Sequence, residues 1–296
     1  MSARFLTVVL ERAFNMRDGF GREIDYMRIS VIDSCNLNCY YCNPCDNNEH
    51  CHALNILSVK EVLCIVRAAT RLGIKHFRLT GGEPLLHPQL DEMVLQIKKI
   101  PGVSSVSLTT NAVLLAQHAK WLKEAGIDSI NVSLDTIDAS EYERITKKPL
   151  LEEVKHGINA AIECGIRVKI NVVLTPQTDV VALTRYVAKK GTDIRFIEMM
   201  PVGEGHTNGV EPYKKVIGTL SKLYGEPCRI NTEKTKEINS GNDKRKIPDN
   251  GPAEYYIFPE LGIRVGLIQA IHGKFCATCN RIRVTADGRL MPCLGS

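Results

Sequence analysis

Three cysteines stand at a spacing that suits metal chemistry. Cys35, Cys39 and Cys42 form a C-x3-C-x2-C pattern directly after the strand-like run Tyr26–Ile32. Three thiolates on one tight loop can bind three irons of a cubane iron–sulfur cluster, which leaves the fourth iron without a protein ligand. An open metal position of this kind can bind a cofactor or a substrate directly. The spacing therefore predicts a cluster with one vacant iron.

A zinc site is the alternative interpretation of these cysteines, because zinc also takes thiolates and imidazoles. Further potential zinc ligands follow closely, namely Cys45, His50, Cys51 and His52. We favour the simpler interpretation that Cys45 and Cys51 are surface thiols outside the metal site.

A second motif follows the next strand-like run, His76–Thr80. It reads Gly81-Gly82-Glu83-Pro84, and its glycines allow the backbone to approach a ligand closely. Alone it could be a simple turn. After the cysteine motif, at the end of the following strand, it resembles the second signature of the radical S-adenosylmethionine superfamily. The resemblance implies that the open iron chelates the amino and carboxylate groups of S-adenosylmethionine, whose cleavage supplies a 5′-deoxyadenosyl radical, and that the glycine-rich backbone pairs with the methionine amino group.

A second cysteine trio lies near the end of the sequence. Cys276 and Cys279 are followed, after thirteen residues, by Cys293. A structural zinc site needs four closed ligands, so three cysteines predict a second cluster with an open iron. Arg281 and Arg283 alternate on a strand-like run, so both point to one face. Two guanidiniums beside a cluster form an anion site, because arginine binds phosphate oxygens bidentately.

The second trio and its arginines resemble the GTP 3′,8-cyclase family, and the resemblance runs from about Gly21 to Leu294. Further family motifs recur in order at Leu108–Asn111, Asn131–Asp135, Val168–Val173 and Arg195–Glu198. The resemblance implies that the radical removes the 3′ hydrogen of GTP and that the ribose radical adds to C8 of guanine. The second cluster would hold the guanine for this attack. Such chemistry depends on positioning and on excluding water.

The resemblance also implies two sets of ligands. Positions matching S-adenosylmethionine contacts are Tyr41, Gly81, Gly82, Glu83, Ser133 and Met200. Positions matching GTP contacts are Arg28, Arg78, Thr109, Lys169, Arg195, Arg281 and Arg283. A triphosphate carries about four negative charges and needs a basic cradle. His76 stands where family members often have lysine, which puts the strength and the pH dependence of that cradle in question.

Strand-like and helix-like runs alternate from residue 26 to 198. The strand-like runs are Tyr26–Ile32, His76–Thr80, Ser104–Thr109, Ser129–Leu134, Arg167–Leu174 and Asp193–Glu198. The helix-like runs are Val59–Leu72, Leu90–Ile100, Ala116–Ala125, Glu152–Cys164 and Val180–Lys190. This alternation predicts an α/β fold, an incomplete parallel (β/α)6 TIM-type barrel of the radical S-adenosylmethionine type. We place the barrel at residues 1–208 and a small α+β auxiliary-cluster domain at residues 209–296.

The pattern changes after about residue 201. Pro201–Pro212 is glycine-rich and resembles a linker, and Asn231–Pro252 is polar and predicts a mobile loop. Between them Tyr213–Tyr224 has helical periodicity. Short strand-like runs follow at Glu254–Phe258, Arg264–Ile268 and Arg281–Thr285.

Composition excludes several classes of protein. The net charge of +5 is mild, and the one dense basic run, Lys244–Lys246, lies in a polar loop, so we expect no nucleic-acid partner. We find no secretory leader and no run long enough to cross a membrane. We therefore expect a cytoplasmic, reducing environment, and in such an environment clustered cysteines, of which this sequence of eleven cysteines has two groups, bind metal more often than they form disulfides.

The family resemblance implies further partners. These are an electron donor such as flavodoxin or ferredoxin and a downstream cyclic pyranopterin monophosphate synthase, and a homodimer is compatible with the family. Family members usually continue to a terminal Gly-Gly pair, and we expect the sequence given, which ends at Ser296, to lack this tail. Two alternatives stay open: an auxiliary-cluster radical enzyme that modifies a peptide, and a non-catalytic, zinc-stabilised binding protein.

Overall fold

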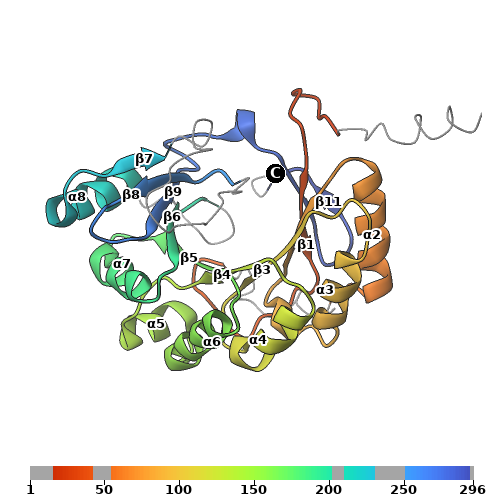
Figure 1. The fold of residues 1–296 in the computed structure, drawn as a ribbon, viewed down its shortest axis with the longest axis horizontal. Coiled ribbons are helices and arrows are strands. Elements are labelled where there is room, and N and C mark those ends of the chain that lie inside the picture. Colours follow the sequence, from red (N-terminus) through yellow and green to blue (C-terminus); the bar gives the residue numbers. More distant parts are fainter. Residues whose placement is uncertain (1–15, 43–54, 202–209, 231–250, 294–296) are drawn as a thin grey trace, which may run out of the picture.

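The computed structural model describes residues 16–42, 55–201, 210–230 and 251–293. Its strands form a single sheet in the order β11-β10-β1-β2-β3-β4-β5-β6-β9-β8-β7. Every neighbouring pair from β10 through β1 and β6 to β9 is parallel. The strands follow an open arc with the helices on its outer side (Figure 1). The predicted partial barrel is confirmed.

The element bounds are as follows. The strands are β1 (Tyr26–Ser30), β2 (His76–Thr80), β3 (Ser105–Thr110), β4 (Ser129–Ser133), β5 (Val168–Leu174), β6 (Asp193–Glu198), β7 (Cys228–Ile230), β8 (Glu254–Ile257), β9 (Arg264–Ile268), β10 (Arg281–Val284) and β11 (Leu290–Met291). The helices are α2 (Val59–Arg71), α3 (Leu90–Lys98), α4 (Leu115–Glu124), α5 (Ala139–Thr146), α6 (Leu151–Glu163), α7 (Val180–Lys189) and α8 (Gly218–Tyr224), with short turns η1 (Pro84–Leu86), η2 (Tyr213–Ile217) and η3 (Cys276–Thr278).

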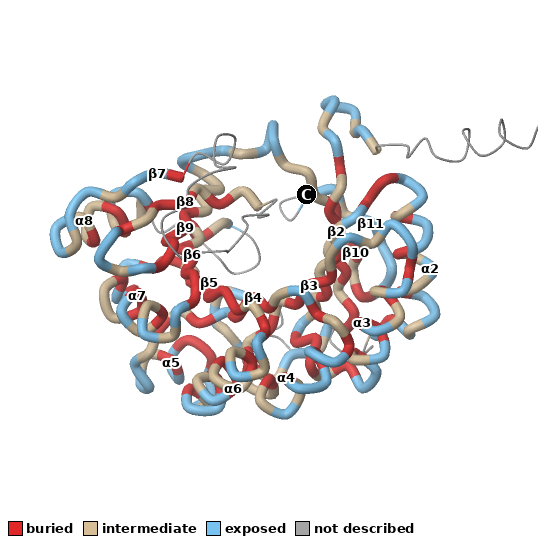
Figure 2. The backbone as a smooth tube through the Cα atoms, viewed as in Figure 1, coloured by how far each residue is buried: buried red, intermediate tan, exposed pale blue. Residues whose placement is uncertain are grey.

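The two faces of the sheet differ in chemistry because side chains alternate along each strand. Met27 and Ile29 of β1 and Phe77 and Leu79 of β2 belong to the apolar core. The core residues of the strands meet the inner stripes of the helices, so burial follows the strands and the inward helix faces (Figure 2). The alternate residues, such as Arg28, therefore lie on the inner, concave face of the sheet.

The helices end where the sequence predicts. Gly73, Gly126 and Gly165 follow α2, α4 and α6 with φ angles of +89°, +88° and +67°. These left-handed angles are accessible to glycine without steric cost, so each residue stops its helix and turns the chain toward the next strand.

The structure differs from the sequence prediction in four elements. Helix α5 is absent from the prediction, although Asp138 caps it: the Asp138 side chain accepts a hydrogen bond from the backbone amide of Glu141. The predicted helix Tyr213–Tyr224 is split into η2 and α8. Strands β7 and β11 are additional, and each pairs antiparallel with its neighbour.

The strands after residue 254 continue the barrel sheet at both edges. β9 pairs with β6, and β10 pairs with β1. The predicted boundary between residues 208 and 209 stays a prediction. The linker at 202–209 and the predicted loop at 231–250 lie outside the described residues. Among the described helices, none is long and apolar enough to cross a membrane.

Candidate active site

Four arginines meet on the inner face of the sheet. Strand register places Arg28 of β1 opposite Arg283 of β10 on one side and opposite Arg78 of β2 on the other. Arg281 lies opposite Tyr26, one pleat away from this row. The predicted alternation of Arg281 and Arg283 is confirmed, since Ile282 and Val284 between and beyond them are buried in the core.

The arginine cluster is electrostatically crowded. Burial lowers the pKa of Arg28 well below its ordinary value, and the charges of Arg78, Arg283 and Arg281 lower it further. The Nε of Arg28 is buried and has no hydrogen-bond partner within the described part of the chain. A polyanion would supply both the missing acceptor and the missing negative charge. This cluster therefore has the chemistry of a phosphate site.

The other cationic residues of the predicted cradle lie across the arc, on β5 and β6. Lys169 is 5% exposed and pairs in register with Asn131 and Asp193. Arg195 donates from Nε to Asn171 Oδ1 at 2.9 Å and from Nη2 to Asn131 Oδ1. Thr109 also lies opposite Asn131. The predicted GTP residues thus form two groups on opposite walls of one polar surface.

His76 lies beside the arginine cluster. Its Nδ1 is 2.8 Å from Ser105 Oγ, and its ring stacks on Tyr26 with centroids 6.2 Å apart. The residue that departs from the family pattern therefore lies on the same inner face as the arginines.

The first cysteine loop lies beyond the carboxyl end of β1, where functional residues of parallel barrels gather. Backbone hydrogen bonds from Asn38 to Thr146 and from Tyr40 to Ile145 anchor it to the end of α5. Burial raises the pKa of the Cys39 thiol to about 12, and the charge of Asp135 adds to the effect. The free thiol is therefore protonated, and a thiolate at this position would need a cation or metal to stabilise it.

The two glycines of the second motif pack against the loop that leads to Cys35. The backbone amides of Gly82 and Glu83 bind this loop, since Gly82 N donates to Ile32 O at 2.7 Å and Glu83 N donates to Ser34 O at 2.8 Å. A Cβ on Gly82 would lie 2.0 Å from Ser34 O, and one on Gly81 would lie 2.4 Å from Ile32 O. The glycines thus permit close approach of two chain segments. Their contact with a cofactor stays a prediction.

Glu83 is 1% exposed, and protein donors surround its carboxylate. Oε1 accepts from Leu85 N at 3.0 Å and Thr110 Oγ1 at 2.6 Å, and Oε2 accepts from Asn111 N at 2.7 Å. Burial raises the pKa of Glu83 to about 7 against these hydrogen bonds. The Nδ2 of Asn111 in turn lies 3.8 Å from Cys35 Sγ. Glu83 therefore orients a neighbour of the first cysteine.

The remaining predicted cofactor residues follow the rim of the barrel. Tyr41 OH donates to Asp135 Oδ2, and Asp135 Oδ1 accepts from Val173 N at 2.7 Å. Burial raises the pKa of Asp135 to about 6. Ser133 is exposed at the end of β4, and Met200 is half-buried just after β6.

The second trio lies at the opposite end of the barrel. Tyr26 N, at the start of β1, donates to Asn280 O, which is next to Cys279. Arg22 Nη1 donates to Cys276 O at 2.9 Å. Cys293 follows β11, whose antiparallel register with β10 brings it back toward Arg281. Burial lowers the pKa of Arg283, while the nearby Cys293 and Cys279 oppose that shift. The two trios therefore lie beyond opposite ends of β1.

Both trios have the donor chemistry of iron–sulfur sites. Within residues 16–42, 55–201, 210–230 and 251–293, no three His, Cys, Asp or Glu side chains converge as ligands of a single ion. A cubane does not require such convergence, because each thiolate binds a different iron. Arg22 and Arg283 would partly neutralise the thiolates of the second trio, so these residues fit a cluster. Cys45 and Cys51 lie outside the described residues.

Several site residues lie within the recognised family motifs, but the sequence assigned them no role. Asn111 and Asp135 lie just beyond the ends of β3 and β4, a placement that is a weak signal, whereas Asn171 lies in the middle of β5. Glu198 is another: it is 4% exposed, accepts from the amide of Ile271 at 2.7 Å, and contacts the Nδ1 of His272. Glu198 therefore fixes the start of the segment that leads from β9 to the second trio.

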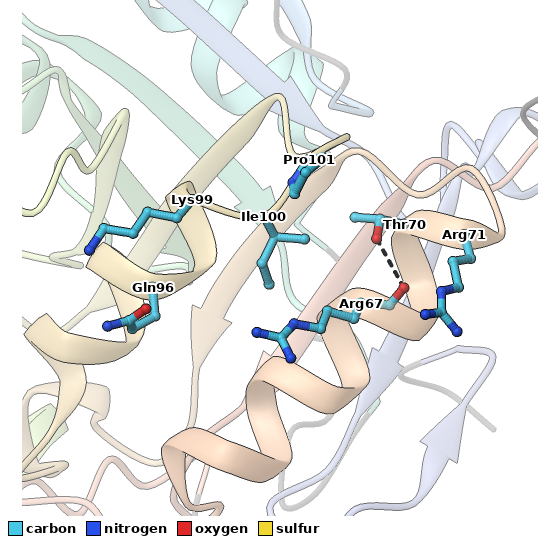
Figure 3. A pocket seen from close by; sticks show the side chains of 7 residues that line it. All are labelled: Arg67, Thr70, Arg71, Gln96, Lys99, Ile100 and Pro101. Carbon is cyan, nitrogen blue, oxygen red and sulfur yellow. Dashed lines mark hydrogen bonds between the residues drawn. The ribbon is translucent and has the colours of Figure 1, made fainter. Parts of the chain in front are cut away.

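A surface hollow of about 310 Å³ lies away from the inner face, between α2 and α3 (Figure 3). Its cationic residues are Arg67, Arg71 and Lys99. Arg71 and Lys99 lie at the carboxyl ends of α2 and α3, where a cation is favoured by the negative end of the helix dipole, which explains these two residues structurally.

Sequence comparisons agree with this geometry. The model of the Radical SAM superfamily matches residues 29–183, and the Molybdenum Cofactor Synthesis C model matches residues 192–296. A GTP 3′,8-cyclase of Clostridium perfringens (strain SM101 / Type A) is 37% identical over 282 residues, which cover 94% of this chain and 83% of the relative. The GTP 3′,8-cyclase of Petrotoga mobilis is 38% identical over 288 residues, which cover 95% of this chain and 84% of the relative.

Solved structures agree in fold. Streptococcus suis SuiB bound to the precursor peptide SuiA has a TM-score of 0.67 at 15% identity, and the match covers 99% of this chain and 63% of SuiB. Native anSMEcpe with bound AdoMet has a TM-score of 0.53 at 20% identity, covering 67% of this chain and 60% of that one. The chain thus spans under two thirds of either structure, and at these identities the likeness concerns the fold alone. With its two matching family models and its close relatives, the chain belongs to the radical SAM superfamily and, within it, to the GTP 3′,8-cyclase family.

Proposed function

We propose that this protein is a GTP 3′,8-cyclase, which converts GTP to (8S)-3′,8-cyclo-7,8-dihydroguanosine 5′-triphosphate in the first step of molybdenum cofactor biosynthesis. The observation that carries the proposal is the group of four arginines on the inner face, between two cysteine trios. The relatives at 37% and 38% identity bear the name of this activity.

Membership of the radical SAM superfamily implies a 4Fe–4S cluster and S-adenosylmethionine at the first trio, Cys35, Cys39 and Cys42. When bound there, this pair supplies a carbon radical that removes a hydrogen atom. Tyr41, Ser133, Met200 and the Gly81–Glu83 backbone line the rim and hold the cofactor. Asp135 fixes Tyr41 through its phenol hydrogen bond.

A second 4Fe–4S cluster belongs to Cys276, Cys279 and Cys293 in this proposal. Three thiolates leave one iron open for the guanine base. Arg28, Arg78, Arg281 and Arg283 bind the triphosphate, and Lys169, Arg195 and Thr109 face it from the other wall. Binding both ends of the nucleotide orients the ribose, because an uncharged radical can be directed only by geometry.

The remaining partners follow from the reaction. It needs an electron donor such as flavodoxin or ferredoxin, and its product is consumed by a cyclic pyranopterin monophosphate synthase. Assembly as a homodimer is compatible with the proposal. The clusters need reduced thiols, so the proposal places the protein in a reducing compartment such as the cytoplasm.

The test is anaerobic turnover of the holoprotein with GTP, S-adenosylmethionine and a chemical reductant. We expect 5′-deoxyadenosine and the cyclised nucleotide in equal amounts, and roughly seven to eight irons per chain for two cubanes. The variant Arg281→Ala with Arg283→Ala should lose GTP binding while S-adenosylmethionine cleavage persists. A colourless zinc protein would contradict the proposal.

A parallel assay with an added leader peptide distinguishes the cyclase from a peptide-modifying radical enzyme. The fold likeness to SuiB does not by itself favour a peptide substrate, because it is a likeness at 15% identity. Hydrogen abstraction from an added leader peptide, without GTP consumption, would replace the cyclase proposal with peptide modification.

A further inference from the structure

Tyr26 occupies a central place in the arginine cluster. It opens β1, and strand register puts Arg281 of β10 on one side of it and His76 of β2 on the other. Its ring centroid is 5.4 Å from the guanidinium carbon of Arg78 and 5.4 Å from that of Arg281. One aromatic ring therefore contacts two cations that come from different strands.

Apolar packing does not account for this tyrosine. Its strand neighbours Met27 and Ile29 belong to the core, whereas Tyr26 belongs to neither apolar cluster of the described residues. It is nonetheless 8% exposed, and its hydroxyl is 3.5 Å from Ser107 Oγ. Its surroundings are the polar side chains of the inner face, so the position has another role than filling the core.

An aromatic face stabilises guanidiniums in a particular way. The attraction acts between the cation and the ring face, so it does not use the in-plane N–H donors that bind phosphate. A carboxylate at the same place would use those donors and cancel the charge. The ring can therefore hold mutually repelling arginines together without using the N–H donors that bind an anion, one of which, Nε of Arg78, donates to Ser107 Oγ at 3.1 Å. Burial is the main cause of the low pKa of Arg28, and the charges of Arg78, Arg283 and Arg281 lower it further.

We propose that Tyr26 is a positioning residue that holds Arg78 and Arg281 in the arrangement that binds the phosphate chain of the nucleotide. The inference rests on the proposed function, since it takes GTP as the ligand. Tyr26 then sets affinity for the phosphates and not for the guanine base. Its contribution grows with the number of phosphates on the ligand.

The experiment measures dissociation constants of guanosine, GMP, GDP and GTP for the anaerobic holoprotein by titration calorimetry. In Tyr26→Leu the loss of both ring contacts should weaken GTP binding roughly tenfold to a hundredfold. The affinity for GDP should fall less than that for GTP, and the affinity for GMP less again. The affinity for guanosine should stay within about threefold of the parent value. Tyr26→Phe keeps the ring and should bind GTP within about threefold of the parent.

Phe77→Leu is the matched control. Phe77 is the register neighbour of Met27 and points to the core on the other face of the sheet. This variant tests for general damage to the same strands, and it should change the dissociation constants of all four ligands by the same factor. Each variant is judged by the ratio of its dissociation constants for GTP and guanosine. A partly unfolded sample changes both constants alike, so it does not imitate the effect. Tyr26→Met, which keeps the length of the side chain without a ring, replaces Tyr26→Leu where that variant does not fold.

Two outcomes would overturn the inference and are distinct from failure of the proposed function. An unchanged GTP affinity in Tyr26→Leu, or an equal loss for all four ligands, refutes the role of Tyr26 alone. If the parent protein itself binds no GTP, the proposed function and this inference fall together.

Discussion

At the scale of single residues, Glu83 shows how a buried carboxylate supports the first cysteine loop. Its two oxygens accept from two backbone amides and one hydroxyl. Glu83→Gln keeps the shape but offers only one acceptor atom, so the amide of Asn111 or of Leu85 faces an NH2 group. We expect a loss of about 1–3 kcal/mol in the free energy of unfolding.

Anaerobic urea denaturation measures this loss. Glu163→Gln, at an exposed position of α6, is the control and should stay within about 0.5 kcal/mol of the parent. Equal midpoints for the two variants would mean that the hydrogen bonds to Glu83 contribute nothing to stability.

The raised pKa of Glu83 also predicts a pH dependence. Burial raises it from an ordinary 4.5 to about 7, so the folded chain holds a proton that the unfolded chain releases. The resulting stability is complete below pH 4.5 and is lost as the pH rises through about 7. Asp135, with its pKa raised to about 6, acts in the same direction at lower pH. Buried His87, whose pKa is lowered, acts in the opposite direction.

The prediction is therefore a comparison between proteins. Between pH 4.5 and 7, the unfolding free energy of Glu83→Gln should rise more, or fall less, with pH than that of the parent. Denaturation midpoints at half-unit intervals measure the two slopes. Parallel curves would show that the carboxyl titrates alike in both states.

The residues found from the sequence are those whose spacing carries the signal. The cysteine trios, the Gly81–Pro84 run and the alternating Arg281 and Arg283 can be recognised in one dimension. The roles of Tyr26 and Asn111 depend on strand register and on where a loop returns. Those relations join residues far apart in the chain, so no local pattern encodes them.

At the scale of elements, the contact between two loops depends on Gly82. An added Cβ would lie 2.0 Å from a backbone oxygen that leads to Cys35, and backbone cannot move aside cheaply. Gly82→Ala should therefore displace the first cysteine loop and lower the iron content by about four atoms per chain. Iron and sulfide analysis with electron paramagnetic resonance measures this.

Gly218→Ala is the control for that substitution. Gly218 opens α8, and nothing lies within 4 Å of its added Cβ. Alanine favours a helix, so we expect unchanged clusters and a gain of up to about 1 kcal/mol in stability. If both variants keep a full iron content, the two loops do not require the close contact.

The elements also show where prediction from sequence fails. The long strands and helices of the barrel lie within two residues of their predicted bounds, because their periodicity is strong. The eight-residue α5 has too few turns to show a period, yet its carbonyls anchor the cysteine loop at Asn38 and Tyr40. Tertiary contacts stabilise such a short helix, and these are not visible in the sequence.

At the scale of the whole molecule, a strand from the last part of the chain pairs with the first strand of the sheet. β10 pairs with β1, and β9 pairs with β6, so the last part of the chain extends both edges of the barrel sheet. The strand-like runs of the sequence predict these strands but not which edge of the sheet each one joins. As a result, two cysteine sites border the same polar inner face, one beyond each end of β1.

The two cysteine sites should therefore be lost independently. The five residues of β1 separate them by roughly 13–17 Å at a strand rise of about 3.3 Å per residue. Sites so far apart, without shared ligands, contribute additively. Replacing Cys276, Cys279 and Cys293 with alanine should remove about half of the iron, abolish cyclisation and leave reductive cleavage of S-adenosylmethionine.

The reciprocal variant, with Cys35, Cys39 and Cys42 replaced by alanine, should keep the other half of the iron and lose all cleavage. Cys64→Ala, at an exposed position of α2, should change neither property. Electron paramagnetic resonance of each reduced variant should show one cluster signal matching a component of the parent spectrum. Loss of both signals in either triple variant would mean that one cluster is needed for the other to assemble, and the opposite ends of the barrel would then not be independent sites.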